Sequence, residues 1–229
     1  MTSKPTPPKI LRNAGAGSAE LYFYGEFGPD WYGYISTELV RNTLANLSPG
    51  TELNIHFNTE GGDVVQASAI YTLLKNWSGK KNGFVDGICW SCGSWVLQAC
   101  DVRTCAENAL VMVHDPEGAC YGRAADMRAE AELLDKVKLT IQGVYSARSG
   151  QTAEAIAAAM TAETWYTAEE AKAFGLVDAV DPNKGPVSMR GDVSRFRNAP
   201  DWLKPLTPQS EPWKRAANER RQLLNELSL

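Results

Sequence analysis

LNIHFNTEGGDVVQASAIYTLL, residues 53–74, is the stretch of sequence that decides the fold. Apolar and polar residues alternate as far as Phe57, which predicts a strand with one buried face. Gly61 and Gly62 then form a turn, and Asp63 stands where it can cap a following helix. The apolar stripe of that helix consists of Val64, Ala67, Ile70 and Leu74. A strand joined to a helix by a short glycine turn is the repeating unit of a parallel α/β sheet.

Similar signals alternate along most of the chain. Strands are expected at 20–25, 84–90, 102–105, 110–113 and 176–180, and helices at 37–47, 94–100, 124–148, 152–160 and 167–175. Short links between such segments predict an α/β fold with a mainly parallel sheet covered by helices. The helix over 124–148 has a narrow apolar seam, which is typical of a helix that packs on one neighbour or on another subunit.

Composition divides the chain into three parts. Residues 1–20 hold prolines and a run of small residues without an apolar period, and they are predicted to form a flexible arm. Residues 21–181 carry the alternating signals and form the predicted domain. In residues 182–229 a proline-rich linker leads to a basic amphipathic helix over 213–227.

The overall composition excludes several classes of protein. With 44% hydrophobic and 22% charged residues the chain is globular, and its net charge of -4 without a basic cluster argues against nucleic-acid binding. No segment reaches the roughly 18 consecutive apolar residues of a membrane span. Five cysteines with no preceding signal peptide are expected to be reduced thiols of a cytoplasmic protein. The sequence indicates neither a metal nor a cofactor.

Candidate catalytic groups occupy three turns. Ser91 lies in a sharp turn after a predicted strand, where its hydroxyl points out of the sheet and the following amides point to the same place. His114 ends the apolar strand over 110–113, a position where α/β sheets hold catalytic groups. His56 lies within a strand and is interpreted as an ordinary sheet histidine. Gly61 and Gly62 allow the backbone to approach a substrate and to aim an amide at it.

Structural interpretations of the same residues stay open. The text around the serine, CWSCG, lacks the first glycine of a G-x-S-x-G elbow. Cys92 is a rival nucleophile, although a buried and merely reduced thiol is the commoner case. Ser94, one turn further on, can be a serine in the interior of a helix. Gly61 and Gly62 can serve a tight turn without any catalytic role.

Three segments together carry a resemblance to a known family. Residues 58–64 (NTEGGDV), 87–97 (GICWSCGSWVL) and 111–116 (VMVHDP) resemble, in order and spacing, the Clp-type ATP-dependent serine peptidases. The resemblance runs from Leu21 to Asp181 and is nearest to the phage and prophage branch of head maturation proteases, for which the text over 163–171 is typical. It implies a crotonase-like, ClpP-like β-α spiral with a projecting handle helix.

The resemblance also implies a catalytic triad. Ser91 matches the nucleophile of the family and His114 matches the base. The acid of the family falls on Glu163, a departure in residue type that keeps the charge, and Asp178 is a second candidate. A glutamate can orient an imidazole as an aspartate does, because a triad is defined by geometry and role.

An oxyanion hole is implied at the glycine turn. It would consist of the amides of Gly62 and Cys92, with Gly61 allowing the close approach. The family usually reads S-P-G-G here, whereas this chain has Thr59 and Glu60 before its glycines, so the rigidity of a proline is missing. A match to the axial loops that engage partner ATPases is also missing at the N-terminal end.

Partners follow from the same resemblance. It implies a ring-shaped homo-oligomer built through the helix over 124–148 and protein or peptide substrates. The phage branch adds a capsid scaffold or portal protein as substrate or partner, in the cytosol of a bacterial host. Two alternatives remain: a crotonase-type acyl-CoA enzyme, which also uses paired backbone amides, and an inactive assembly subunit that keeps the fold.

Overall fold

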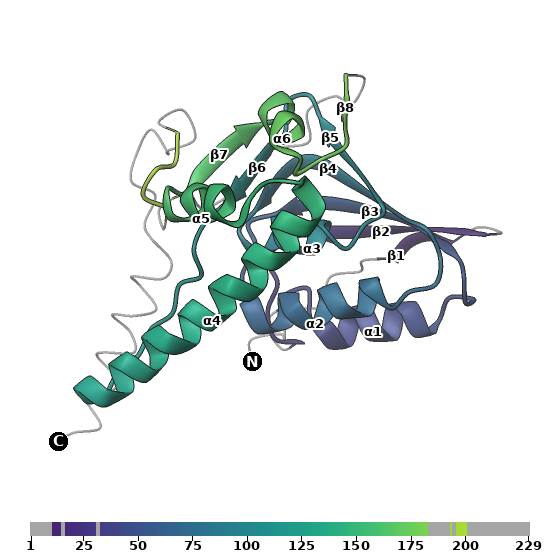
Figure 1. The fold of residues 1–229 in the computed structure, drawn as a ribbon. Coiled ribbons are helices and arrows are strands. Elements are labelled where there is room, and N and C mark those ends of the chain that lie inside the picture. Colours follow the sequence, from purple (N-terminus) through teal and green to yellow (C-terminus); the bar gives the residue numbers. More distant parts are fainter. Residues whose placement is uncertain (1–10, 15–16, 31–32, 183–192, 194–195, 201–229) are drawn as a thin grey trace, which may run out of the picture. The chain divides into compact units, whose positions relative to one another are not determined.

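The computed structural model describes residues 11–14, 17–30, 33–182, 193 and 196–200 (Figure 1). Strands and helices alternate through the predicted domain. In chain order they are β1 (Leu11–Ala14), β2 (Ser18–Tyr24), α1 (Thr37–Ala45), β3 (Glu52–Thr59), α2 (Val64–Lys75), β4 (Lys81–Trp90), α3 (Cys92–Leu97), β5 (Val102–Ala106), β6 (Leu110–Val113), α4 (Ala124–Ser149), α5 (Ala153–Thr161), β7 (Thr164–Thr167), α6 (Ala168–Phe174) and β8 (Ala179–Asp181).

Strand β4 is the branch point of the sheet. The main path runs β1-β2-β3-β4-β5-β8, while β6 pairs with β4 and with β7. Residues 82–85 of β4 pair with β5, and residues 88–90 pair with β6. All pairings are parallel except β1 with β2 and β6 with β7. The carboxyl ends of β3, β4 and β6 therefore meet at one edge, where parallel sheets place their ligands.

The core lies between the sheet and helices α1, α2 and α3, with α1 packed beside α2 and α2 beside α3. The alternation in β3 is confirmed, because Leu53, Ile55 and Phe57 are fully buried. The predicted cap is also present, since the Asp63 side chain accepts hydrogen bonds from the amides of Val65 and Gln66. The sequence pattern thus sets both the buried face of the strand and the start of its helix.

Helix α4 is buried only near its C-terminal end. Ile141 and Tyr145 are buried there, whereas Met127, Leu133 and Leu139 are each more than half exposed. The N-terminal half of α4 projects beyond the sheet (Figure 1), as the predicted handle helix requires. Within the described ranges, no helix combines the length and apolar character that crossing a membrane requires.

The prediction of a flexible arm over 1–20 is wrong for part of that segment. Strand β1 pairs antiparallel with β2, and Gly17, with φ 98°, directly precedes β2. The four residues of β1, LRNA, are too few to show an apolar period. Residues 1–10, and nearly all of the predicted linker and helix over 182–229, lie outside the described residues.

Candidate active site

Ser91 occupies a strained turn between β4 and α3. Its backbone has φ 54° and ψ -132°, a combination that costs a residue with a side chain about 1–3 kcal/mol. The amide of Ser91 donates to the carbonyl of Met112 on β6 at 3.0 Å. The turn is therefore attached to the neighbouring strand at the residue that carries the hydroxyl.

His114 follows β6 directly and faces this hydroxyl. The parallel register places Trp90 of β4 opposite Met112 of β6, so the two strands end side by side. His114 Nε2 lies 2.7 Å from Ser91 Oγ, and its side chain is only 11% exposed. With Nε2 unprotonated, the serine hydroxyl donates to it, which is the ground-state contact between a nucleophile and its base.

Glu163 directly precedes β7, the antiparallel neighbour of β6. The β6–β7 pairing ends with Val113 opposite Thr164, so His114 follows the last pair on one strand and Glu163 precedes it on the other. Glu163 is buried, and Trp165 Nε1 donates to its carboxylate at 3.3 Å. Its φ is 50°, and among the described residues only Ser91 and Glu163 combine a positive φ with a side chain.

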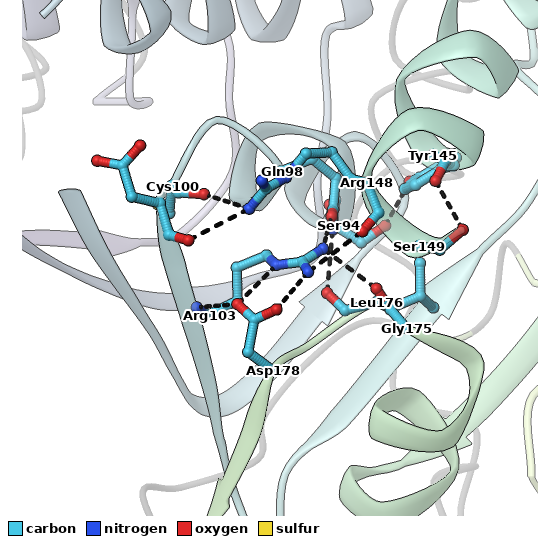
Figure 2. A network of polar contacts seen from close by, with 11 residues as sticks. Ser94, Gln98, Cys100, Arg103, Tyr145, Arg148, Ser149, Gly175, Leu176 and Asp178 are labelled. Atoms are coloured by element: carbon cyan, nitrogen blue, oxygen red, sulfur yellow. Dashed lines mark hydrogen bonds and ion pairs between the residues drawn. The ribbon is translucent and has the colours of Figure 1, made fainter. Parts of the chain in front are cut away.

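Asp178, the second candidate acid, belongs to a different cluster. Both of its carboxylate oxygens accept from Arg103, whose side chain donates to them at 3.1 and 2.6 Å and whose amide donates at 2.7 Å (Figure 2). Burial raises the pKa of Asp178, but the hydrogen bonds from Arg103 together with the charges of Arg103 and Arg148 lower it by more, so the net pKa lies below 3.8. The structure commits this carboxylate to an ion pair with a buried arginine.

One carboxylate near His114 was not predicted from the sequence. Glu117 Oε1 lies 3.9 Å from His114 Nδ1, and the Glu117 side chain is about half exposed. The distance exceeds that of a hydrogen bond, so this carboxylate acts on the imidazole only through its charge. A spacing of three residues was the only signal in the sequence, and it is too common to identify such a pair.

Gly61 lies directly against the serine turn. Its φ is 92°, and a Cβ there would come within 2.8 Å of the Ser91 Cβ and 3.1 Å of the Cys92 amide nitrogen. A side chain at this position would therefore push the serine away. Thr59 Oγ1 accepts from the amide of Gly61 at 3.1 Å, which restrains the turn.

Gly62, the next residue, is packed against Phe27. Its φ is 128°, and a Cβ would overlap the carbonyl oxygen of Phe27. Phe27 holds both flanking residues, since its amide donates to Gly61 and its carbonyl accepts from Asp63. In the part of the chain that the structure describes, the amide of Gly62 donates to no other group. The Cys92 thiol donates to the Gly62 carbonyl at 3.5 Å.

A small pocket opens at the hydroxyl of Ser91. Its apolar walls come from Val64 on α2, Trp95 on α3, and Ile141 and Tyr145 on α4. The pocket has room for about one water molecule. Over the described ranges, no group of three or more histidine, cysteine, aspartate or glutamate side chains is arranged to hold a metal ion.

A strained serine after a parallel strand, a histidine at the end of the neighbouring strand and a glycine turn packed against the serine are the parts of a serine hydrolase site. A sequence model of one family with such sites, described as Clp protease, matches residues 25–184. This match covers more than half of the sequence, and the chain belongs to the Clp protease family.

Two relatives show how far the sequence of this chain differs from other sequences of the family. The chain is 31% identical over 139 residues to the ATP-dependent Clp protease proteolytic subunit 3 of Streptomyces coelicolor, an alignment that covers 60% of this chain and 64% of the relative. It is 29% identical over 143 residues to the ATP-dependent Clp protease proteolytic subunit of Pleurastrum terricola, covering 62% and 73% respectively. The first alignment spans less than two thirds of that relative's length.

Proposed function

We propose that this protein is a serine endopeptidase of the Clp type, which cleaves peptide bonds through an acyl-enzyme on Ser91. The observation that carries the proposal is the 2.7 Å contact between Ser91 Oγ and His114 Nε2. A hydroxyl at this distance from an imidazole can transfer its proton while it attacks a carbonyl carbon. The match of the Clp protease family to residues 25–184 supports the same chemistry.

Glu163 is the acid of the proposed triad. The β6–β7 pairing supports this assignment, because it ends one residue before His114 and one residue after Glu163, and the positive φ of both Ser91 and Glu163 supports it further. Strained backbone persists only where the surrounding structure enforces it, and it concentrates at functional sites. The carboxylate would hold the imidazole tautomer and stabilise the imidazolium that forms.

The reaction then follows from the positions of these groups. Ser91 Oγ attacks the scissile carbonyl carbon while His114 takes the proton, and the carbonyl oxygen becomes an oxyanion that accepts from the amides of Gly62 and Cys92. His114 returns the proton to the leaving amine, which breaks the peptide bond and leaves an ester on Ser91. Water, activated by His114, hydrolyses that ester and restores the hydroxyl.

Labelling with a fluorophosphonate probe tests the nucleophile, because only an activated serine reacts readily. The wild-type protein is expected to be labelled at Ser91, and Ser91→Ala is expected to lose both labelling and peptide hydrolysis. Ser146→Ala is the matched control, since the Ser146 hydroxyl makes no hydrogen bond in the described part of the chain. A crotonase-type enzyme or an inactive subunit would leave the wild-type protein unlabelled.

The same variants separate serine from cysteine chemistry. Full activity in Ser91→Ala together with its loss in Cys92→Ala would show that the nucleophile assignment is wrong. The assay must resolve rates near the background, because binding and an oxyanion hole alone can leave roughly 10³-fold catalysis over water.

We further propose proteins of a phage head, such as scaffold or portal protein, as the natural substrates. The support is the resemblance of residues 163–171 to the head maturation branch. Incubation of the full chain with purified proheads, followed by mass spectrometry of the products, tests this substrate class. Cleavage that Ser91→Ala abolishes supports it, whereas intact head proteins beside a cleaved model peptide contradict it.

We also propose that the chain assembles into a ring-shaped homo-oligomer through α4. The support is the resemblance of the helix to the handle of Clp-type peptidases, together with the exposure of Met127, Leu133 and Leu139, each of which is more than half exposed. Light scattering at micromolar concentration is expected to give a mass several times that of the chain. A stable monomer under these conditions contradicts the assembly.

A further inference from the structure

A buried hydroxyl lies directly behind the serine turn. Ser94, in the first turn of α3, is fully buried, and its Oγ contacts three oxygen atoms. These are the carbonyl oxygen of Ser91 at 2.7 Å, the carbonyl oxygen of Met112 at 3.0 Å and the hydroxyl oxygen of Tyr145 at 2.6 Å. Figure 2 shows Ser94 and Tyr145 within one continuous polar network.

The direction of these hydrogen bonds follows from counting protons. A serine hydroxyl has one proton, and a carbonyl oxygen can only accept. Ser94 therefore donates to the two carbonyls, and Tyr145 must donate to Ser94. Burial raises the pKa of Tyr145 far above its ordinary value, so the phenol keeps its proton throughout the working range of pH.

This hydroxyl joins the two segments that carry the proposed nucleophile and base. The Ser91 carbonyl belongs to the strained residue itself. The Met112 carbonyl also accepts the Ser91 amide, and Met112 is two residues before His114 in the chain. Ser94 thus links both sides of the Ser91–His114 pair through their main chains.

Helix α4 supplies the outer support for this link. Tyr145 projects from its buried end, and the Ser149 hydroxyl donates to the Tyr145 carbonyl one turn later. Two turns before Tyr145, Lys138 donates to Asp115 Oδ2 at 2.8 Å, and Asp115 is the residue after His114. One helix therefore contacts the surroundings of both reacting side chains.

We propose that Ser94 and Tyr145 are positioning residues, which hold the main chain of Ser91 so that its hydroxyl stays within reach of His114. The inference rests on the proposed function, because it concerns the geometry of that same serine. Neither side chain touches the reacting atoms through its hydroxyl, and their effect passes through the carbonyls of Ser91 and Met112. Small displacements of a nucleophile lower rates steeply, since attack requires reacting atoms near 3 Å.

Tyr145→Phe and Ser94→Ala test the proposal in the full-length protein, because each removes a hydroxyl and little volume. Each is expected to lower kcat, and the rate of fluorophosphonate labelling, by about tenfold, with KM within about twofold of wild type. The double variant is expected to lose no more than the worse single variant, since both changes break one hydrogen-bond chain. A purely structural role would lower the melting temperature and leave kcat unchanged well below it.

Tyr166→Phe is the matched control, because it removes another phenol hydroxyl from a buried tyrosine, on β7, and should leave kcat unchanged. Wild-type labelling rates in both Tyr145→Phe and Ser94→Ala overturn the positioning role while Ser91 remains the nucleophile. Additive losses in the double variant also overturn it, because they mean that the two hydroxyls act separately. An unlabelled wild-type protein, in contrast, is a failure of the proposed function itself.

Discussion

The two histidines of the chain belong to the same sheet and have opposite surroundings. His56 lies within β3, where its Nδ1 is 2.7 Å from Asp86 and its Nε2 is 3.1 Å from Glu20. Its ring is stacked between Tyr22 and Phe84, at centroid distances of 4.6 and 5.1 Å. His114 lies beyond the end of β6, and its Nε2 faces the hydroxyl of Ser91.

The difference follows from the position of each residue along its strand. The register places Tyr22 of β2 and Phe84 of β4 on either side of His56, so neighbouring strands supply partners for both faces and both nitrogens. A residue just past the end of a strand has few neighbours from adjacent strands beside it, and loops and the starts of helices surround it instead. Mid-strand polar groups are therefore satisfied by the fold, whereas those at the end can face a substrate.

Replacing each histidine with glutamine tests the difference between the two histidines most directly. His114→Gln is expected to lower kcat by about 10³-fold, because the proton of Ser91 loses its acceptor. His56→Gln is expected to keep kcat within about twofold, since both of its nitrogens face carboxylates away from the serine. Steady-state hydrolysis of a short peptide measures both, and similar losses in the two variants would remove the distinction.

Substitutions at the two candidate acids, Glu163 and Asp178, test a second difference, for which a smaller effect on kcat is expected. Glu163→Gln should lower kcat by about 10²-fold with an intact fold, because the neutral amide no longer stabilises the imidazolium. Asp178→Asn should leave kcat near wild type, since this carboxylate is bound to Arg103. Circular dichroism of both variants controls for folding. Equal small effects on kcat would indicate a dyad of Ser91 and His114 without an acid.

Asp178 should instead contribute to the free energy of unfolding. Removing one partner of a buried ion pair costs several kcal/mol, but the Asp178 side chain is 41% exposed, so solvent screening reduces the expected loss to about 1–2 kcal/mol. The pKa of Asp178 is lowered in the fold, so its contribution is complete above the ordinary value of 3.8 and is lost as the pH falls through the lower, folded value.

Urea unfolding of wild type and Asp178→Asn at a series of pH values measures this contribution. The difference in free energy of unfolding is expected to be constant near neutral pH and to shrink below about pH 4, where the wild-type carboxylate takes up its proton. A difference that grows on acidification would contradict the assigned ion pair.

Local patterns were enough to predict much of the fold and the central pair of the site. The alternation in β3, the cap at Asp63 and the turn at Ser91 each involve residues within one or two turns of chain. The position of His114 followed from the end of an apolar run. Such features depend on backbone geometry and burial, which short stretches of sequence encode directly.

Contacts between distant parts of the chain could not be predicted in the same way. Ser94 and Tyr145 are 51 positions apart, and the Arg103–Asp178 pair spans 75 positions. A serine inside a helix and an aspartate near a strand have many possible partners, and the choice depends on tertiary packing. For this reason the sequence leaves Glu163 and Asp178 as rival acids, and only the structure shows that Asp178 is bound to Arg103.

The distribution of the thiols gives the protein a natural attachment point for a reporter group. Four of the five cysteines are buried and Cys120 is exposed, next to the fully exposed Tyr121 in the segment that precedes α4. Burial also raises the pKa of Cys100 and Cys105 to about 12, which keeps them protonated and unreactive at neutral pH. A maleimide dye should therefore modify the native protein at a single position without any engineered substitution. Its emission would then report whether a second molecule covers the projecting N-terminal end of α4.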